Sequence, residues 1–469
     1  MVIEQIYTGC LAQGAYYIHS KGEAAIIDPL REVGPYRDRA RRDNVTIKYI
    51  FETHFHADFV SGHVTLAEHT GAPIIYGPNA SPSFEAHIAR DGEEFVIGDL
   101  TIRVLHTPGH TMESTTYLLL DATGREHAIF TGDTLFLGDV GRPDLSQKGA
   151  DITMEDLAGY SFDSLRSKIM PLPDDVIVYP AHGAGSACGK NMMKETVDTL
   201  GNQKKMNYAL RADMTREEFI QEVTDGLLPP PAYFPLNVKL NKEGYEGIDV
   251  VVDQGMKALT PKSFELLASE TDAVMLDVRT PSDFATGHVP NSIFIGLDGS
   301  FAPWVGELII DVKQPILLIA PQGREEEAII RLSRVGFDHT IGFLEGGIDA
   351  WEGAGYETGS VRSVAASTLA VDYEDYKERI FDVRKESEYI SSHIVGAHNL
   401  PLSSINQQLS SIPPSESVYI HCAGGYRSMI ASSILKSRGY HDLIDVQGGF
   451  KSIKDTDIPI SEYVCPTTL

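Results

Sequence analysis

The sequence predicts an α/β protein of three domains, and three observations support this. The chain has 469 residues, which is too many for a single hydrophobic core. In the first half, short apolar strands alternate with turns and helical patterns, and several strands end on a histidine or an aspartate. The second half contains one pattern of strands and helices twice. Strands that alternate with helices are typical of α/β domains.

The composition is that of a globular protein, with 42% hydrophobic and 22% charged residues. The 66 acidic residues outnumber the 39 Lys and Arg and give a net charge of −27, which disfavours nucleic acid and acidic membrane surfaces as partners. The sequence has no run of apolar residues long enough to span a membrane and no signal-peptide pattern. The four cysteines are too few for a disulfide framework, so a reducing compartment and a cytoplasmic location are expected.

The first half is predicted to be built mainly from short strands. AYYIH, EAAIIDP and IKYIF are the first three, and VTLAEHTGAPIIYGP is predicted to be a helix that leads into a strand. FVIGDLTIRVLHTPGH, TTYLLL and HAIFTGDTLF supply further strands. A helical pattern over 192–225 includes Thr215 as a helix cap with Glu218 three residues later. The prolines of PPPAYFP (229–235) are then expected to end regular structure.

Histidines and aspartates follow several of these strands. His54, His56 and Asp58 come directly after IKYIF in THFHADF, while His110 lies in HTPGHT and Asp133 in FTGDTLF. Any one of these histidines alone is better explained as an ordinary core or surface residue. The ordered set is not explained in this way. Imidazole nitrogens and carboxylate oxygens together bind divalent metals, and the loops at strand ends often carry catalytic or binding residues. The sequence therefore predicts a metal site.

HxHxD, TPGHT, TGDTLF and YPAHG (179–183) together resemble the metallo-β-lactamase superfamily. The resemblance implies an αββα sandwich over residues 1–246, with the metal in a cleft at one edge. The two-metal hydrolases of this superfamily usually read HxHxDH, but Phe59 stands where the last histidine would be. His54, His110 and Asp133 remain, and two histidines with one carboxylate suit a single Fe(II) with open positions.

Two stretches, FLGDVGRPDL (136–145) and PPPAYFPLNV (229–238), resemble the persulfide dioxygenases of this superfamily. The resemblance implies Fe(II) held by His54, His110 and Asp133, with His56, Asp58 and His182 around the metal without binding it. AHGAGSACG (181–189) replaces the AHDY of many glutathione-using relatives, so the thiol carrier stays open between glutathione, coenzyme A, bacillithiol and others. Cys188 is either a redox thiol or a buried inert cysteine.

The second half contains an internal repeat with an offset of 105 residues. Asp277, Arg279, Phe284 and His288 recur as Asp382, Arg384, Tyr389 and His393. LDVR, the later histidine and a closing Gly-Gly resemble the rhodanese sulfurtransferase family, over residues 250–357 and 362–465. Each copy is predicted to form a small parallel sheet wrapped by helices, with both histidines in structural roles.

Only the second copy has a candidate nucleophile. The strand SVYIH ends at Cys422, and a predicted persulfide loop follows, formed by Ala423, Gly424, Gly425, Tyr426, Arg427 and Ser428. Backbone N–H groups and a helix N-terminus stabilise a thiolate or persulfide there, and Arg427 adds positive charge. The first copy reads APQGR (320–324), without a cysteine. We expect it to be inactive and to serve as a spacer, docking or oligomerisation module.

These features predict a persulfide dioxygenase fused to a sulfurtransferase. A low-molecular-weight thiol persulfide and O2 would give sulfite and a thiol, and Cys422 would carry sulfane sulfur, with thiosulfate as product or donor. One alternative is a zinc-dependent thioester hydrolase of glyoxalase II type with accessory rhodanese domains. The other is a sulfur carrier with an inactive metal domain. A homo-oligomer is expected by analogy with the family.

Overall fold

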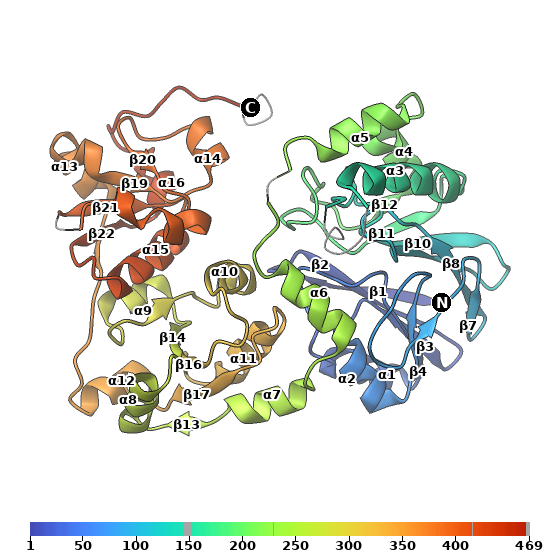
Figure 1. Cartoon of the computed structure of the whole chain (residues 1–469), viewed down its shortest axis with the longest axis horizontal. Helices are drawn as coiled ribbons and strands as arrows, with labels where there is room; N and C mark the ends of the chain where they lie inside the picture. The colour runs from blue at the N-terminus through green and yellow to red at the C-terminus, as the bar shows by residue number, and fades with distance from the viewer. Residues whose placement is uncertain (145–151, 228, 415, 466–469) are drawn as a thin grey trace. The chain divides into compact units, whose positions relative to one another are not determined.

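The computed structural model describes residues 1–144, 152–227, 229–414 and 416–465 (Figure 1). The chain divides into two compact units. Unit 1 comprises Met1–Val250 and Ile330–Asp338, and unit 2 comprises Val251–Ile329 and His339–Leu469. Within the described residues, none of the helices combines the length and the apolar character needed to cross a membrane.

Unit 1 contains two mixed six-stranded sheets. The first has the order β1-β2-β3-β4-β5-β6 and the second the order β12-β11-β10-β9-β8-β7. The strands of the first sheet are β1 (Val2–Thr8), β2 (Gln13–Ser20), β3 (Glu23–Ile27), β4 (Thr46–Phe51), β5 (Ile74–Tyr76) and β6 (His87–Ile88). Those of the second are β7 (Glu94–Ile97), β8 (Leu100–His106), β9 (Thr115–Leu120), β10 (Glu126–Gly132), β11 (Ile177–Pro180) and β12 (Asp198–Thr199).

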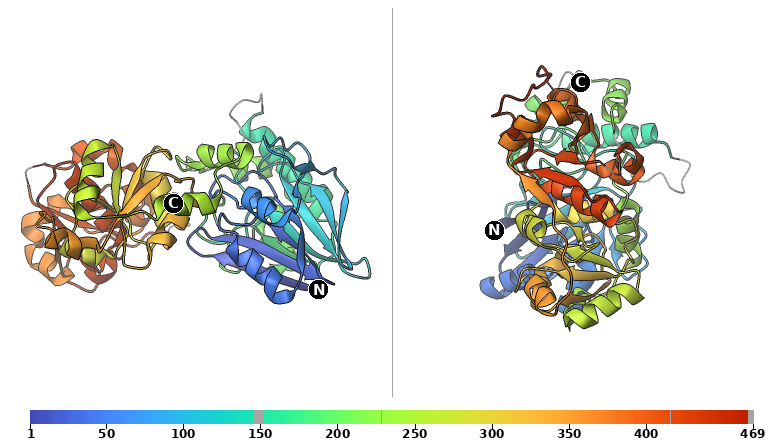
Figure 2. Two further views of the ribbon diagram at one scale, coloured as in Figure 1. Left: turned by 90° about the horizontal axis from the view of Figure 1, so that it is seen from below. Right: turned by 90° about the vertical axis from the view of Figure 1, so that its left-hand side faces the viewer.

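The two sheets of unit 1 pack face to face (Figure 2). Successive residues of a strand point to opposite faces, so Tyr16 of β2 enters the core between the sheets while Tyr17 enters a second core on the outer side. α1 (Gly34–Asp43) and α2 (His63–Thr70) cover this outer side. The outer side of the second sheet packs against α3 (Met154–Ser164), the π-helical turn η1 (Leu165–Ile169), α4 (Leu200–Met206) and α5 (Arg216–Thr224). The predicted αββα sandwich is confirmed.

Two sequence expectations in unit 1 are wrong in detail. The region 192–225 is not helical from its start, because β12 and the loop before it precede α4. The expected capping box of Thr215 and Glu218 is present at α5. The prolines of 229–235 do not end regular structure, since α6 (Phe234–Glu243) begins among them with a proline in its first turn. A proline is tolerated there because the first N–H groups of a helix have no partner within the helix.

Unit 2 contains two five-stranded parallel sheets with equivalent strand orders, β13-β17-β16-β14-β15 and β18-β22-β21-β19-β20. The identical topology accounts for the sequence repeat. The strands of the first copy are β13 (Ala258–Leu259), β14 (Val274–Asp277), β15 (Ile293–Phe294), β16 (Ile316–Ile319) and β17 (Thr340–Leu344). Those of the second are β18 (Arg362–Val364), β19 (Ile380–Asp382), β20 (His398–Asn399), β21 (Val418–His421) and β22 (Leu443–Val446).

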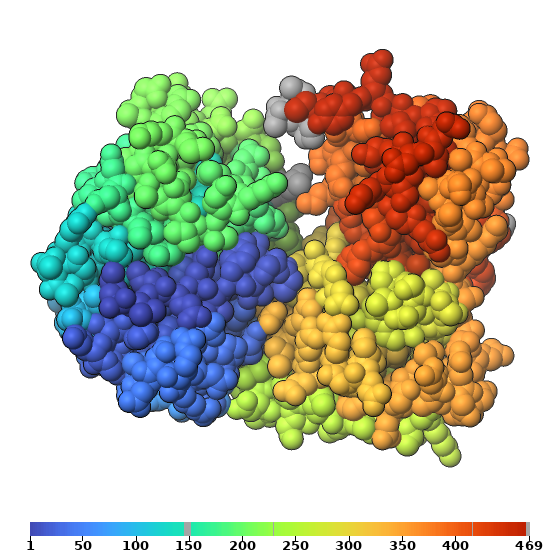
Figure 3. All heavy atoms as spheres, turned by 180° about the vertical axis from the view of Figure 1, so that it is seen from behind, coloured from blue at the N-terminus to red at the C-terminus, as the bar shows by residue number. Residues whose placement is uncertain are grey.

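Helices follow most strands of each copy, as the repeat predicted. α7 (Ile248–Gly255) spans the boundary between the units, and the first copy contains α8 (Pro261–Glu270), α9 (Pro281–Thr286), α10 (Phe301–Leu308), α11 (Glu325–Ser333) and α12 (Gly347–Gly353). The second copy contains α13 (Ala366–Tyr376), α14 (Glu386–Ser391), α15 (Tyr426–Ser437) and α16 (Gly449–Ile453). The last described residues run along the outside of unit 2, where Ser461 N–H donates to the His393 carbonyl (Figure 3).

The repeated residues make the same contacts in both copies. Arg384 binds both carboxylate oxygens of Asp382 and donates to the Ser392 carbonyl. Arg279 binds Asp277 and the Gly287 carbonyl in the same way. His288 stacks on Phe284 and His393 on Tyr389, each with centroids 3.9 Å apart, and each Nδ1 donates to the carbonyl of its stacking partner. These contacts are structural.

Replacing Asp382 by alanine is expected to destabilise unit 2 by about 3–5 kcal/mol, because it leaves the guanidinium of Arg384 buried without a counter-charge. Thermal unfolding of the full chain would measure this. Asp298→Ala is the control, since Asp298 pairs with Arg324 at the surface and such pairs contribute about 0–1 kcal/mol. Equal losses in the two variants would contradict the structural role assigned to the Asp382–Arg384 pair.

Candidate functional sites

Three buried side chains from different strands converge in unit 1. His54 follows β4, His110 follows β8 and Asp133 follows β10, and each is 2% exposed. Asp133 Oδ2 lies 3.8 Å from His54 Nε2 and 3.4 Å from His110 Nε2. Atoms that each lie about 2.1 Å from one shared ion are about 3–3.5 Å apart. Asp133 Oδ2 has no hydrogen-bond partner among the described residues, and the arrangement therefore fits a metal ion.

Hydrogen bonds fix both histidines in the form that a metal requires. The Thr53 hydroxyl donates to Asp28 Oδ2 (2.9 Å), so it can only accept from His54 Nδ1 (3.0 Å). His110 Nδ1 donates to the Arg142 carbonyl (2.8 Å). In the neutral form of each ring, these bonds place the lone pair on Nε2, on the side of Asp133. Burial, together with the nearby imidazolium of His56, holds the pKa of His54 well below its usual value, which keeps this ring neutral.

His182 bridges two carboxylates. Its Nδ1 lies 2.8 Å from Asp133 Oδ1 and its Nε2 lies 2.8 Å from Asp58 Oδ2. Burial alone would lower the pKa of His182, but the two carboxylates outweigh it and raise the pKa well above its usual value. The imidazolium binds Oδ1 of Asp133, so Oδ2 is left facing His54 and His110. The structure thus places His182 beside Asp133, one of the candidate metal ligands, and Asp58 beside His182.

His56 is directed away from the converging atoms. Its Nε2 lies 3.1 Å from Asp28 Oδ1 and 3.5 Å from Glu52 Oε2, while its ring centroid is 4.2 Å from that of His54. Burial opposes its charge, but the two carboxylates raise the pKa of His56 to about 10. Sequence reasoning missed both carboxylates. Their signal was present in the sequence, since Glu52 directly precedes THFHAD and Asp28 directly follows the strand EAAII.

Phe59 and Cys188 complete the surroundings of the centre. Phe59 is fully buried with its ring centroid 4.4 Å from that of His56, and it offers no atom to a metal. Cys188 is 1% exposed and lies in a group with Asp58 and His182 whose donor atoms are all within 4.8 Å of one another. Burial and the neighbouring carboxylates raise the pKa of the Cys188 thiol well above its usual value, which favours an inert thiol. Its redox role stays a prediction.

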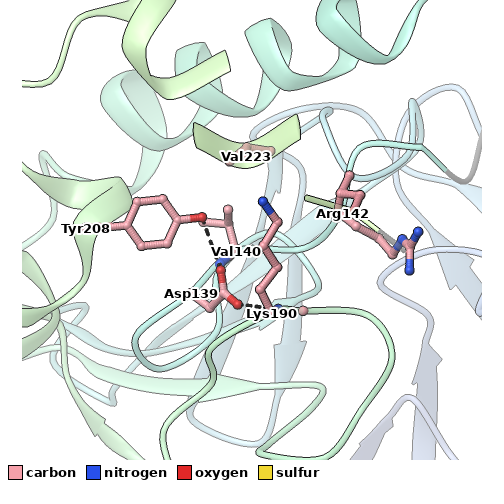
Figure 4. Close-up of a pocket in the computed structure, with 8 residues that line it drawn as sticks. Asp139, Val140, Arg142, Lys190, Tyr208 and Val223 are labelled. Carbon is pink, nitrogen blue, oxygen red and sulfur yellow. Dashed lines mark hydrogen bonds between the residues drawn. The ribbon is translucent and has the colours of Figure 1, made fainter. Parts of the chain in front are cut away.

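The stretch 136–144 supports the centre from one side, and Leu145 at its end lies outside the described residues. The Asp139 carboxylate accepts from the Lys190 N–H (2.6 Å) and from the Tyr208 hydroxyl (Figure 4). It also accepts from the Asn191 N–H (2.7 Å). Arg142 N–H donates to the Cys188 carbonyl (3.0 Å), while its own carbonyl holds His110. This stretch therefore connects the backbone at Cys188 to His110, a candidate metal ligand.

His182→Gln is expected to lower metal affinity by about 10- to 100-fold, the usual cost of removing a partner that orients a ligand. Glutamine cannot supply the positive charge that now lies between Asp133 and Asp58. Competition with a chelator would measure the affinity, and His398→Gln, at an exposed position, is the control. Unchanged affinity in His182→Gln would rule out the positioning role of His182.

The candidate sulfur-transfer site follows β21. Cys422 is 1% exposed, and Gly425 N–H donates to its Sγ at 3.1 Å. Gly425 has φ 102° and precedes α15, whose N-terminus faces the loop. A glycine adopts this backbone conformation without strain. The loop is shorter than the sequence suggested: Ala423, Gly424 and Gly425 form it, whereas Tyr426, Arg427 and Ser428 lie in the first turn of α15.

The side chains of that turn are held by neighbours. Arg427 makes a two-pronged ion pair with Glu388, at 2.6 and 2.9 Å, so its charge is largely neutralised. The Ser428 hydroxyl donates to Asp445 Oδ1 (2.6 Å). Sequence reasoning missed Glu388, which is 39 residues from Arg427 and comes from α14. In the first copy the equivalent turn lies between Ile319 and Glu325 and has no cysteine.

Comparison with known protein families agrees with the fold of unit 1 and with the repeated fold of unit 2. Residues 8–182 match the model of the metallo-β-lactamase superfamily. Residues 260–354 and 365–456 match that of the rhodanese-like domain. The protein is thus an enzyme with the metallo-β-lactamase fold and a candidate metal site, joined to rhodanese-like domains. More specifically, the chain carries one metallo-β-lactamase superfamily domain followed by two rhodanese-like domains.

Individual relatives cover different parts of the chain. A solved metallo-β-lactamase from Staphylococcus aureus is 30% identical, with a TM-score of 0.64, and the match covers 74% of this chain and 99% of that one. The human mitochondrial persulfide dioxygenase ETHE1 is 28% identical over 47% of this chain and 78% of its own length. A hydroxyacylglutathione hydrolase from Tolumonas auensis is 33% identical over 36% of this chain. The match spans only 60% of that hydrolase.

Proposed function

We propose that the chain oxidises a low-molecular-weight thiol persulfide with O2 at a mononuclear Fe(II) site and transfers sulfane sulfur through Cys422. The observation that carries the proposal is the donor set of His54, His110 and Asp133 with Phe59 buried beside it. Two imidazoles and one carboxylate with open positions are typical of Fe(II) oxygenases. The persulfide dioxygenase among the relatives and the rhodanese-like domains support a sulfur substrate.

When bound, iron would supply the redox chemistry by which R–S–SH, O2 and water give R–SH, sulfite and two protons. The chain's own residues prepare the site for this. His54 and His110 are each fixed by a hydrogen bond through Nδ1, and His182 fixes the carboxylate of Asp133. Because all of these groups are buried, the site orients its reactants and limits access of bulk water.

The second reaction uses Cys422. Its thiolate would attack the outer sulfur of R–S–SH, forming Cys–S–SH and releasing R–S⁻. Sulfite would then take that sulfur to give thiosulfate and the free thiol. The Gly425 N–H at 3.1 Å and the N-terminus of α15 stabilise the negative sulfur in each step. Linking both sites in one chain raises the effective concentration of sulfite near Cys422.

A zinc-dependent thioester hydrolase is the second candidate, since the hydroxyacylglutathione hydrolase among the relatives is 33% identical over its matched region. Phe59 is the observation against it. A two-metal hydrolase needs donors for a second ion, and this buried ring supplies none.

Metal reconstitution under anaerobic conditions separates the two candidates. The full chain is loaded with Fe(II) or with Zn(II), and oxygen uptake is followed on addition of glutathione, coenzyme A or bacillithiol persulfide. We expect uptake only with iron, with sulfite as product. Thioester hydrolysis by the zinc form, together with no uptake from any persulfide, would refute the dioxygenase proposal in favour of the hydrolase.

A further inference from the structure

A cavity of about 510 Å³ adjoins the Cys422 loop, and both rhodanese-like copies line it. Ser282 and Thr286 of α9 come from the copy without a cysteine. The other side is formed by the loop residues Gly424 and Gly425 and by Gln447, which follows β22. Gly425 is also the residue whose N–H donates to Cys422 Sγ. The first copy therefore supplies part of the wall of a cavity that the candidate nucleophile's loop also lines.

The two copies are fixed to one another at this point within unit 2. The Tyr426 hydroxyl donates to the Gly296 carbonyl (2.7 Å), and Phe294 N–H donates to the Ser433 hydroxyl (2.9 Å). A Cβ on Gly299 would lie 2.4 Å from the Tyr426 ring, so only glycine permits this close packing. α9 also packs beside α15. Because Tyr426 begins the helix directly after the loop, the position of the α9 wall is tied to that of Cys422.

As far as the chain is described, the lining of the cavity offers no cationic side chain to hold an anionic sulfur donor. None of the described residues that line the cavity is Lys, Arg or His, and Asp445 is among them. Arg427, in the first turn of α15 after the loop, is engaged by Glu388 at 2.6 and 2.9 Å. Thiosulfate carries two negative charges and would have no free cationic side chain from this lining, whereas anion sites normally use Arg or Lys. The lining instead offers hydroxyl groups and the Gln447 amide.

The size of the cavity also favours an organic sulfur donor over thiosulfate. Pockets for organic ligands are typically about 300–1,000 Å³, and this cavity falls in that range. Thiosulfate would leave most of it filled with water. A thiol with an uncharged arm that carries amide or hydroxyl groups matches both the volume and the polar lining.

We propose that the cysteine-less copy is a specificity element, in which Ser282 and Thr286 of α9 contact the organic arm of the persulfide that delivers sulfur to Cys422. The step is the one given above: R–S–SH and the Cys422 thiolate yield Cys–S–SH and R–S⁻, and R remains in the cavity until release. This inference rests on the sulfur-transfer role proposed for Cys422. It gives the first copy a role other than spacer or docking module.

The test measures sulfur loading of Cys422 in the full chain by the mass of the peptide that contains it. Pantetheine persulfide is the organic donor, because its arm carries amides and a hydroxyl group without charge, and thiosulfate is the inorganic donor. Ser282→Trp and Thr286→Trp place an indole in the cavity at exposed positions of α9. Ser269→Trp is the matched control, at an exposed position of α8 in the same copy and outside the cavity lining.

We expect wild type and Ser269→Trp to load rapidly from pantetheine persulfide and at least about tenfold more slowly from thiosulfate. Ser282→Trp and Thr286→Trp should lose at least about tenfold in loading from pantetheine persulfide. Alkylation of Cys422 by iodoacetamide, a small reagent, should be equal in all four proteins. Equal loading of the tryptophan variants and the control, or loading of wild type from thiosulfate as fast as from the organic donor, would overturn the inference. No loading of wild type from either donor would instead refute the sulfur-transfer role of Cys422.

Discussion

Replacing His110 by alanine is expected to abolish iron binding and oxygen uptake together. His110 supplies one of the three donor atoms that converge here among the described residues, and its Nε2 lies 3.4 Å from Asp133 Oδ2. Removal of even an outer partner of a ligand usually costs about 10- to 100-fold, so loss of a ligand should lower oxygen uptake by more than about 100-fold. Iron content after reconstitution and initial rates of oxygen uptake would be measured on the same samples.

His106→Ala is the matched control for this experiment. His106 lies four residues earlier, at the end of β8, and its Nε2 hydrogen-bonds to the Met112 carbonyl rather than approaching Asp133. We expect iron content and oxygen uptake close to those of wild type. If His110→Ala bound iron as wild type does, the donor set proposed here would be incorrect. Iron loss with persistent oxygen uptake would place the oxidation elsewhere in the chain.

The candidate metal ligands were predictable from the sequence because their signals are local. Each of His54, His110 and Asp133 lies shortly after the end of an apolar strand. Strand ends that meet at one edge of a sandwich bring such residues together. The roles of Asp28 and Glu52 were not predicted, because only the folded chain shows that both carboxylates face His56. These carboxylates direct the second histidine of HxHxD away from the candidate ligands.

The rhodanese half shows the same division between local and distant signals. A repeat with constant offset identifies two equivalent sheets, and a cysteine after an apolar strand identifies the loop. The ion pair of Arg427 with Glu388 joins residues of α15 and α14 that are 39 positions apart, and nothing in the sequence around Arg427 indicates it. The cavity could not be predicted from the sequence either, because the residues that line it come from segments as far apart as Ser282 and Gln447.

Cys422→Ser is expected to leave oxygen uptake unchanged and to remove sulfur transfer. A serine hydroxyl is a far weaker nucleophile than a thiolate at neutral pH, so transfer should fall by at least about 1,000-fold. In the full reaction with persulfide, sulfite should then accumulate in place of thiosulfate. Cys465→Ser, at an exposed cysteine, is the control and should give the wild-type mixture.

If thiosulfate formed at the normal rate in Cys422→Ser, sulfur would be reaching sulfite by a route other than the second rhodanese-like copy. A fall in oxygen uptake in this variant would show that sulfur delivered through Cys422 supplies the iron site, and would thereby fix the direction in which sulfur moves between the two reactions.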